Sequence, residues 1–316
     1  MTATHNDLVI RPITGHDELG LFCQIPYVLN EELVSDLNDG HRRPGWLWVA
    51  LHGDRLLARA GWWKMRHHAA PQVLDIFDIA DHSGSSQCLD IGARLVREAV
   101  AKVVRQGTSF PEYSRFIPPD WRDHPAARRA VEGRMQALER TGARLFVERF
   151  RLEWRPGTPI TARTGRLSFG PVRDQQALIS PMTEVMDGTL DAHGRRDLTR
   201  MSPAKAAIRH YEEELSRYRS PREWWRIGAL PDGEPAGFVI PAHNGYNPII
   251  AYIGVLPAYR GHGYIDELLA EGTRILAAED VPRIRASTDL GNVPMANAFL
   301  RAGWADFSHE INMTWD

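Results

Sequence analysis

The stretch YIGVLPAYRGHGYIDELL, residues 252–269, decides how this chain folds. A short apolar strand runs into Pro257, a turn of sequence RGHG follows at residues 260–263, and an amphipathic helix begins after it. Glycines at the start of a helix let backbone N–H groups approach an anion closely, and the N-terminus of a helix is electropositive. The segment therefore predicts a strand, a turn and a helix that together bind a pyrophosphate.

Two common phosphate-binding motifs are excluded by the residues around this turn. No Gly-Lys pair occurs anywhere in the chain, so the turn is not a Walker A loop. A dinucleotide-binding fingerprint needs a third small residue three positions after Gly263, where this chain has Asp266. An ordinary strand-turn-helix, in which the glycines only shape the turn, is the alternative interpretation.

Two motifs resemble those of the Gcn5-related N-acetyltransferases (GNAT). The first is an Arg or Gln, two residues, Gly, one residue, then Gly or Ala; Arg260 and Gly263 match it, and Ile265 stands where the family usually has Gly or Ala. The second is an Asn before a helix that ends in Gly and an aromatic residue, and NVPMANAFLRAGW at residues 292–304 resembles it. Gly303 is expected to close that helix in a left-handed conformation.

The resemblance implies acetyl-CoA (coenzyme A) as the cofactor. It implies backbone pairing of the cofactor with Gly254, Val255 and Leu256, with the Val255 N–H as the oxyanion donor. It also implies that Asn292 lies beside the pantetheine arm, and that Phe299 contacts the cofactor where the family commonly has a proton-donating Tyr. The expected pyrophosphate-binding residues are Arg260, Gly261, His262, Gly263, Tyr264 and Ile265.

Acyl transfer to an amine also requires that the amine be neutral, which calls for a proton acceptor. The candidates are Tyr252 on the strand, His243 in the loop before it and Asp289 after the strand IRAST. Their alternative roles are a packed strand aromatic, a surface histidine and a turn cap, and a water relay to one of them would also serve. A covalent enzyme intermediate is not required, and neither Cys23 nor Cys88 has a histidine context that suggests one.

The chain reads as an internal duplication. Residues 138–154 align without a gap on residues 299–315, and residues 46–61 resemble residues 224–239 as hairpins. The sequence RPGTPITARTGR is rich in turn residues and predicts an interdomain linker at residues 155–166. The predicted domains are therefore residues 1–154 and residues 167–316.

The two copies differ at the phosphate-binding turn. Residues 76–100 align without a gap on residues 252–276, so that Arg260 falls on Gly84 and Gly263 on Gln87. The first copy is therefore expected to be a degenerate scaffold, with a compensated second cofactor site as the alternative.

The alternation of strands and helices predicts an α/β (α+β layered) fold class. With the resemblance, this implies two tandem GNAT-like domains. Each is expected to be a mixed, mostly antiparallel sheet with helices on both faces and a splayed central strand pair.

Composition limits the class of protein and its partners. The chain has 316 residues, 43% of them hydrophobic, and a formal net charge of −2, which argues against nucleic acid as a partner. No apolar run is long enough to span a bilayer, and two cysteines are too few for a disulfide framework, so no membrane partner and a cytoplasmic location are expected. His67 and His68 are adjacent and lack further ligand spacing, so no metal site is predicted. A monomer or homodimer is expected.

The resemblance implies an N-acetyltransferase that transfers acetyl from acetyl-CoA to a primary amine of a small molecule by direct attack. Residues 178–218 are where the family builds acceptor specificity, and Glu184, Asp187, Asp191 and His193 would favour a cationic amine there. A non-catalytic acyl-CoA or small-molecule binding protein is the alternative.

Overall fold

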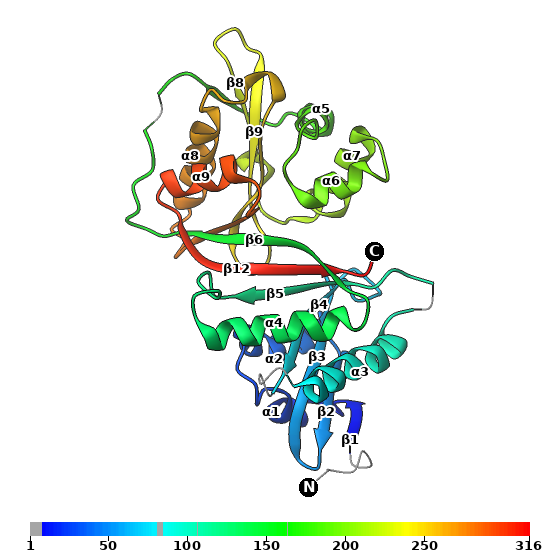
Figure 1. Cartoon of the computed structure of the whole chain (residues 1–316). Coiled ribbons are helices and arrows are strands. Elements are labelled where there is room, and N and C mark those ends of the chain that lie inside the picture. Colours follow the sequence, from blue (N-terminus) through cyan, green and yellow to red (C-terminus); the bar gives the residue numbers. More distant parts are fainter. Residues whose placement is uncertain (1–7, 81–84, 106, 163) are drawn as a thin grey trace. The chain divides into compact units, whose positions relative to one another are not determined.

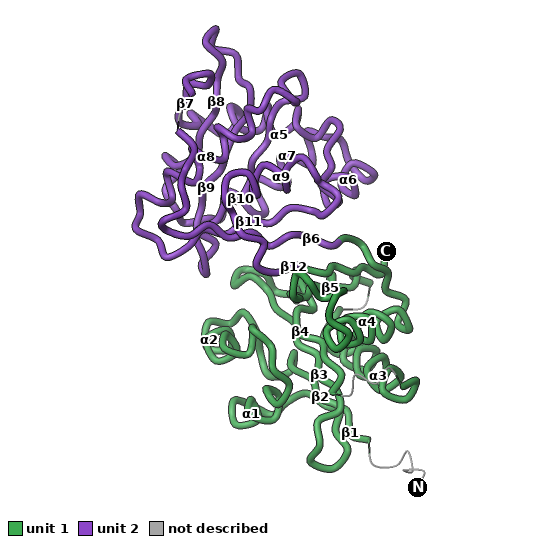
Figure 2. Tube along the Cα trace, turned by 60° about the vertical axis from the view of Figure 1, so that its left-hand side comes forward, with its two compact units in different colours: residues 1–147, 310–316 green, residues 148–309 purple. Residues whose placement is uncertain are grey.

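A computed structural model of the chain describes residues 8–80, 85–105, 107–162 and 164–316. The chain forms two compact units, shown in green and purple in Figure 2: residues 1–147 with 310–316 (unit 1), and residues 148–309 (unit 2). Among the described residues, no helix combines the length and the apolar character that crossing a bilayer requires.

The two contiguous copies repeat one order of elements, in which a strand, helices and a hairpin precede a strand-helix-strand-helix-strand series. The first copy contains β1 (Leu8–Pro12), α1 (Leu19–Phe22), α2 (Leu33–Asp39), β2 (Leu47–His52), β3 (Arg55–Trp63), β4 (Val73–Ile79), α3 (Ser86–Val103), β5 (Glu112–Ile117), α4 (Pro125–Glu139) and β6 (Arg144–Trp154). The second contains β7 (Ser168–Pro171), α5 (Gln175–Val185), α6 (Ala192–Leu198), α7 (Pro203–Glu213), β8 (Arg226–Ala229), β9 (Pro235–His243), β10 (Pro248–Val255), α8 (Tyr264–Ala277), β11 (Ile284–Asp289), α9 (Val293–Arg301) and β12 (Ala305–Thr314).

Helices cover both faces of the sheet in each unit. In unit 2, α8 and α9 lie on one side of β9 and α5 and α7 on the other (Figure 1). Side chains of each pair form a core with the strands. In unit 1, α3 and α4 form one core with the strands, and the segment that contains α1 and α2 forms the other. Strand β9 is buried along residues 236–242 because it lies between the two helical layers. The predicted α/β fold class is confirmed.

The central strands of unit 2 splay apart. Strand β10 pairs antiparallel with β9 along its whole length, with an irregularity between Ile250 and Tyr252. Its parallel pairing with β11 consists of Ile249 opposite Arg285. Strands β10 and β11 therefore separate toward Val255, which is the splayed pair that the resemblance implied. The parallel strands of unit 1 likewise pair only at two positions near their start, Val73–Glu112 and Leu74–Tyr113.

The last strand of each copy does not stay with its own copy. Residues 149–154 of β6 pair antiparallel with β11 in unit 2, while residues 310–314 of β12 belong to unit 1, next to β5. The compact units therefore do not coincide with the contiguous halves 1–154 and 167–316. The sequence does not predict this exchange, because a strand can pair with any open sheet edge within its reach. No sequence motif marks which edge a final strand will join.

A buried histidine lies near the point where β12 leaves unit 2. The Nδ1 atom of His309 is 2.9 Å from Glu148, its Nε2 atom is 3.0 Å from Asp306, and Phe150 packs edge-on against its ring. Burial alone would lower the pKa of His309, but the hydrogen bonds to both carboxylates outweigh it and leave the pKa raised. Two carboxylate acceptors favour the doubly protonated imidazolium.

The His309 cluster predicts a pH-dependent stability. Because the folded-state pKa is raised above the unfolded value near ~6.5, this contribution is complete below that value and is lost as pH rises through the folded-state pKa. The variant His309→Gln is expected to lose about 2 kcal/mol at pH 6, and less as pH rises toward 9. Thermal unfolding across this range measures it. The exposed His124→Gln variant should match the wild type throughout, and a pH-independent deficit in His309→Gln would contradict the assignment.

Candidate functional site

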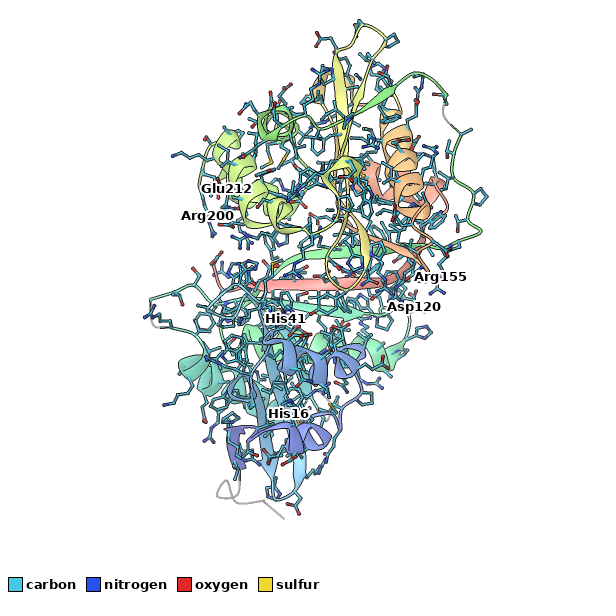
Figure 3. All side chains as sticks on the ribbon, turned by 180° about the vertical axis from the view of Figure 1, so that it is seen from behind. His16, His41, Asp120, Arg155, Arg200 and Glu212 are labelled. Atoms are coloured by element: carbon cyan, nitrogen blue, oxygen red, sulfur yellow. The ribbon has the colours of Figure 1, made fainter. Side chains whose placement is uncertain are left out.

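The gap between β10 and β11 opens into a cavity of about 750 Å³, lined entirely by residues of unit 2. Strands β10 and β11 form its floor, and the turn before α8 and the first turns of α9 close one side. The α6–α7 segment forms the opposite wall; Figure 3 labels Arg200 and Glu212 on this segment, although neither of the two lines the cavity. Most of the expected cofactor-binding residues line it: Gly254, Val255, Arg260, Gly261, Gly263, Tyr264, Ile265, Asn292 and Phe299.

Alternate backbone groups of β10 face this cavity. The Leu256 N–H donates to Ala236 O of β9 at 2.9 Å. In an antiparallel ladder, hydrogen-bonded pairs alternate with non-bonded pairs, so Val255 and Ile253 direct their N–H groups away from β9 and toward the gap. The backbone N–H groups of Gly254 and Leu256 therefore face β9, and Ile253 joins Val255 in directing its N–H toward the gap.

The turn before α8 presents backbone amides that lack protein partners. Gly261 (φ 83°) and Gly263 (φ 76°) are left-handed, a conformation that glycine adopts without strain. Among the described residues, no acceptor binds the N–H groups of residues 261–265. A Cβ added at Gly261 would meet no atom within 4 Å. Open amides at the N-terminus of a helix suit an anion.

Arg166 holds this turn from the side opposite its amides. Its Nη1 donates to His262 O at 2.8 Å and its Nη2 to Gly263 O at 3.4 Å, and its Nε is 2.7 Å from Glu267. In a trans peptide the N–H points opposite to the preceding C=O, so these contacts turn the amides of Gly263 and Tyr264 away from Arg166. Arg166 lies in the segment expected to be a linker, and the sequence did not single it out.

The Arg260 side chain joins the end of β10 to α5. Its guanidinium donates to Val185 O (2.9 Å), Asp187 O (2.7 Å) and Val255 O (3.2 Å), and its backbone N–H bonds Pro257 O (3.3 Å). A cation at the C-terminus of a helix is favourable because carbonyl groups there are unsatisfied. Although Arg260 lines the cavity, these contacts make it a residue that positions the turn rather than a phosphate ligand.

The three expected proton acceptors lie in different surroundings. Tyr252 lines the cavity, but burial raises its pKa, which disfavours it as a base. Asp289 lies outside the cavity lining, where it is 3.0 Å from the Arg149 guanidinium and accepts the Ala192 N–H at 2.6 Å. His243 also lies outside, in the β9–β10 hairpin, where its Nδ1 accepts the Gly245 N–H. The structure brings none of the three to the cavity as a free acceptor.

The expected residues of α9 line the cavity, and each also has a local structural contact. The Asn292 side chain accepts the Met295 N–H at 3.4 Å and caps the helix. Phe299 is 2% exposed and packs edge-on against Trp304. Gly303 is left-handed (φ 78°) and closes the helix as expected.

Two further cavity residues were missed by the sequence analysis. The Ser287 hydroxyl on β11 is buried and has no hydrogen-bond partner among the described residues. His210 on α7 stacks on Tyr252 with ring centroids 4.8 Å apart. Of the residues expected to favour a cationic acceptor, Asp191 and His193 line the cavity, whereas Glu184 and Asp187 do not. A lone Ser or His in such segments carries no signal until the fold brings it to the site.

In unit 1, charged side chains fill the place that corresponds to this cavity. Asp78 of β4 aligns with Gly254, and its carboxylate is 2.8 Å from both Arg59 and Arg115 and 3.5 Å from Arg134. The three arginines and Asp78 are all buried. The strand registers place Arg115 at the position of Thr288 in unit 2, and the helix alignment places Arg134 at that of Met295.

Desolvated charges of this kind are costly to separate, because removing any partner leaves the others buried and unpaired. The cluster occupies the part of unit 1 that corresponds to the cavity floor of unit 2, whereas Gly84, which aligns with Arg260, lies outside the described residues.

Comparisons with known proteins agree with this geometry. Residues 193–304 match the model of the acetyltransferase (GNAT) family. No curated protein sequence matches the chain. The fold is similar to the crystal structure of a GCN5-related N-acetyltransferase from Sphaerobacter thermophilus, with 14% identity, a TM-score of 0.59 and coverage of 98% of this chain and 95% of that one.

Two other solved structures have a similar fold. A tandem GNAT protein from the clavulanic acid biosynthesis pathway shares 14% identity at a TM-score of 0.53, over 97% of this chain and 98% of that one. A GCN5-related glucosamine N-acetyltransferase region of a fungal multi-domain β-N-acetylglucosaminidase shares 11% identity at a TM-score of 0.56. The match covers 97% of this chain and 38% of that one. Residues 193–304 therefore match the acetyltransferase (GNAT) family, and the fold of the chain as a whole is similar to that of GNAT proteins, a tandem one among them.

Proposed function

We propose that this chain is an acyl-CoA-dependent N-acyltransferase that transfers acetyl from acetyl-CoA to a primary amine of a small molecule. The observation that carries the proposal is one cavity with backbone donors at two places. The N–H groups of Ile253 and Val255 face it from β10, and at its other side lie the amides of residues 261–265, for which the described part of the chain offers no acceptor.

These residues suit the parts of an acyl-CoA. Amides at the N-terminus of α8 would hold the pyrophosphate, and the Ile253 backbone would pair with the pantetheine arm. Acetyl-CoA, when bound, supplies a thioester that a neutral amine can attack. The Val255 N–H would stabilise the charge that develops on the carbonyl oxygen. The buried Ser287 hydroxyl offers a donor that the protein itself leaves unused.

The opposite wall suits a cationic acceptor. Asp191, Asp197, Glu213 and Glu214 line it, with Arg209 close to Asp197 and 3.9 Å from Glu213. Carboxylates around a cavity raise the local concentration of cations and so favour protonated amines.

A binding protein without turnover is the second candidate, and Phe299 is the observation that favours it. Phenylalanine lacks the hydroxyl that commonly protonates the leaving thiolate in this family. Acyl transfer then requires another donor or water.

Thiol release from acetyl-CoA with a panel of primary amines tests the proposal, together with calorimetry of coenzyme A binding. Turnover with at least one amine supports the enzyme, whereas binding without turnover supports the second candidate. We expect one coenzyme A per chain, because the charged cluster occupies the corresponding part of unit 1. Two equivalents would contradict that interpretation, and no binding would overturn the proposed function.

Arg166→Ala is expected to weaken coenzyme A binding about 10-fold, equivalent to ~1.4 kcal/mol. Without the clamp on His262 O and Gly263 O, the amides of the turn lose their fixed direction. Calorimetry measures the change in Kd. Arg173→Ala removes an exposed arginine elsewhere in unit 2 and should leave Kd unchanged. Equal Kd values for the two variants would contradict the positioning role of Arg166.

A further inference from the structure

We propose that His210 is the catalytic base of this chain, and that it takes the proton from the acceptor ammonium. This assignment rests on the proposed acyltransferase function. It comes from the placement of one imidazole between the cavity, the strand that carries the oxyanion donor and an anchored carboxylate.

His210 lies against the middle of β10. Its ring stacks on Tyr252 at a centroid distance of 4.8 Å and an interplanar angle of 19°, and both residues line the cavity. The stacking fixes the imidazole plane, and about a third of the side chain remains exposed (35%). Tyr252 precedes Ile253 and Val255, so His210 faces the segment whose amides point into the cavity.

A carboxylate supports one nitrogen of the ring. The Nε2 atom of His210 is buried without a hydrogen-bond partner among the described residues, and it lies 3.8 Å from Glu214. Glu214 is itself anchored, because it accepts the Tyr218 hydroxyl at 2.6 Å. A proton on Nε2 would point toward this carboxylate, and Nδ1 would then be the acceptor.

Other groups around the cavity are less suited to the role. Burial raises the pKa of Tyr252, and the Arg260 guanidinium is bound to three carbonyl oxygens. The other charged or titratable groups that line the cavity are His193, Arg149, Asp191, whose carboxylate caps α6 through the Gly194 N–H, and Asp197 and Glu213 beside Arg209.

The proton and bond changes balance as follows. The acceptor ammonium gives a proton to Nδ1 of neutral His210 and becomes a free amine. The amine nitrogen attacks the thioester carbon, the C–N bond forms, and the C–S bond breaks with its electron pair leaving on sulfur. The second nitrogen proton passes to the thiolate, directly or through water, and the His210 proton is released to solvent. Imidazole is the side chain that changes protonation near neutral pH, which suits this exchange.

The test compares kcat against pH for wild type, His210→Gln, Glu214→Gln and the exposed control His52→Gln, with acetyl-CoA and the best amine of the panel. We expect His210→Gln to lower kcat about 100-fold at pH 7. The residual rate of His210→Gln should rise with pH, because only amine that is already neutral reacts. The rise in kcat near neutral pH that is expected of the wild type (the neutral limb of the profile) should be absent. The Kd for coenzyme A should stay within threefold, which also shows that the fold is intact.

Two further measurements distinguish proton transfer by His210 from a purely structural role of this residue. Imidazole added to His210→Ala should restore part of the rate, and Glu214→Gln should shift the neutral limb while keeping it. Wild-type turnover with an unchanged profile in His210→Gln would overturn the His210 assignment alone. Absence of turnover in the wild type with every amine would overturn the proposed function and this assignment with it.

Discussion

Gly237→Ala is expected to destabilise the protein by about 3 kcal/mol, a loss of roughly 6–12 °C in Tm for unit 2. A Cβ at this position of β9 would lie 2.3 Å from Gly254 O and 2.7 Å from the Leu268 Cδ1 atom. The leucine can rotate, but the carbonyl belongs to the facing strand, so β10 itself has to move. The displaced segment is the one that directs the Val255 amide into the cavity, so coenzyme A binding should weaken as well.

Gly170→Ala is the matched control for this prediction. Gly170 also lies in a strand of unit 2, and a Cβ there would meet no atom within 4 Å. It should change stability by less than ~1 kcal/mol in either direction. Thermal unfolding and coenzyme A calorimetry of both variants measure the difference. A Gly237→Ala variant as stable as Gly170→Ala would contradict the close approach of β9 and β10.

Gly263→Trp is expected to abolish coenzyme A binding, with a rise in Kd of at least 100-fold, or about 2.7 kcal/mol. The left-handed conformation of Gly263 (φ 76°) is costly for a residue with a Cβ. The indole would also crowd the amides that are proposed to hold the pyrophosphate.

Gly233→Trp separates these effects from general damage to unit 2. Gly233 is also left-handed (φ 91°), has open space around it and lies in the β8–β9 turn. It should suffer the same backbone strain yet bind coenzyme A like the wild type. If Gly263→Trp also binds normally, the turn before α8 is not the pyrophosphate site.

The local features of the site could be predicted from the sequence because they depend on neighbouring residues. The glycine turn, the helix after it and the cap at Gly303 follow from backbone conformations that glycine favours. The backbone direction along β10 could not be predicted, because it depends on the register with β9. The Leu256–Ala236 hydrogen bond and the strand register together show that the Ile253 N–H faces the cavity and the Gly254 N–H faces β9.

The missed residues reach the site from distant parts of the chain. Arg166 precedes the turn that it clamps by about a hundred residues, and His210 meets Tyr252 only because α7 packs over β10. Neither position has a motif around it. The fold class was predictable from alternating elements, whereas the exchange of final strands depends on which sheet edge is open.

That exchange has a consequence for biosynthesis. Residues 310–314 complete the sheet of unit 1 beside β5, yet they follow all of unit 2 in the chain. While the ribosome synthesises unit 2, the edge of β5 is unpaired, and an unpaired strand edge can pair with strands of other chains. Expressing the two copies as separate polypeptides should therefore give two incomplete folds that assemble only on mixing.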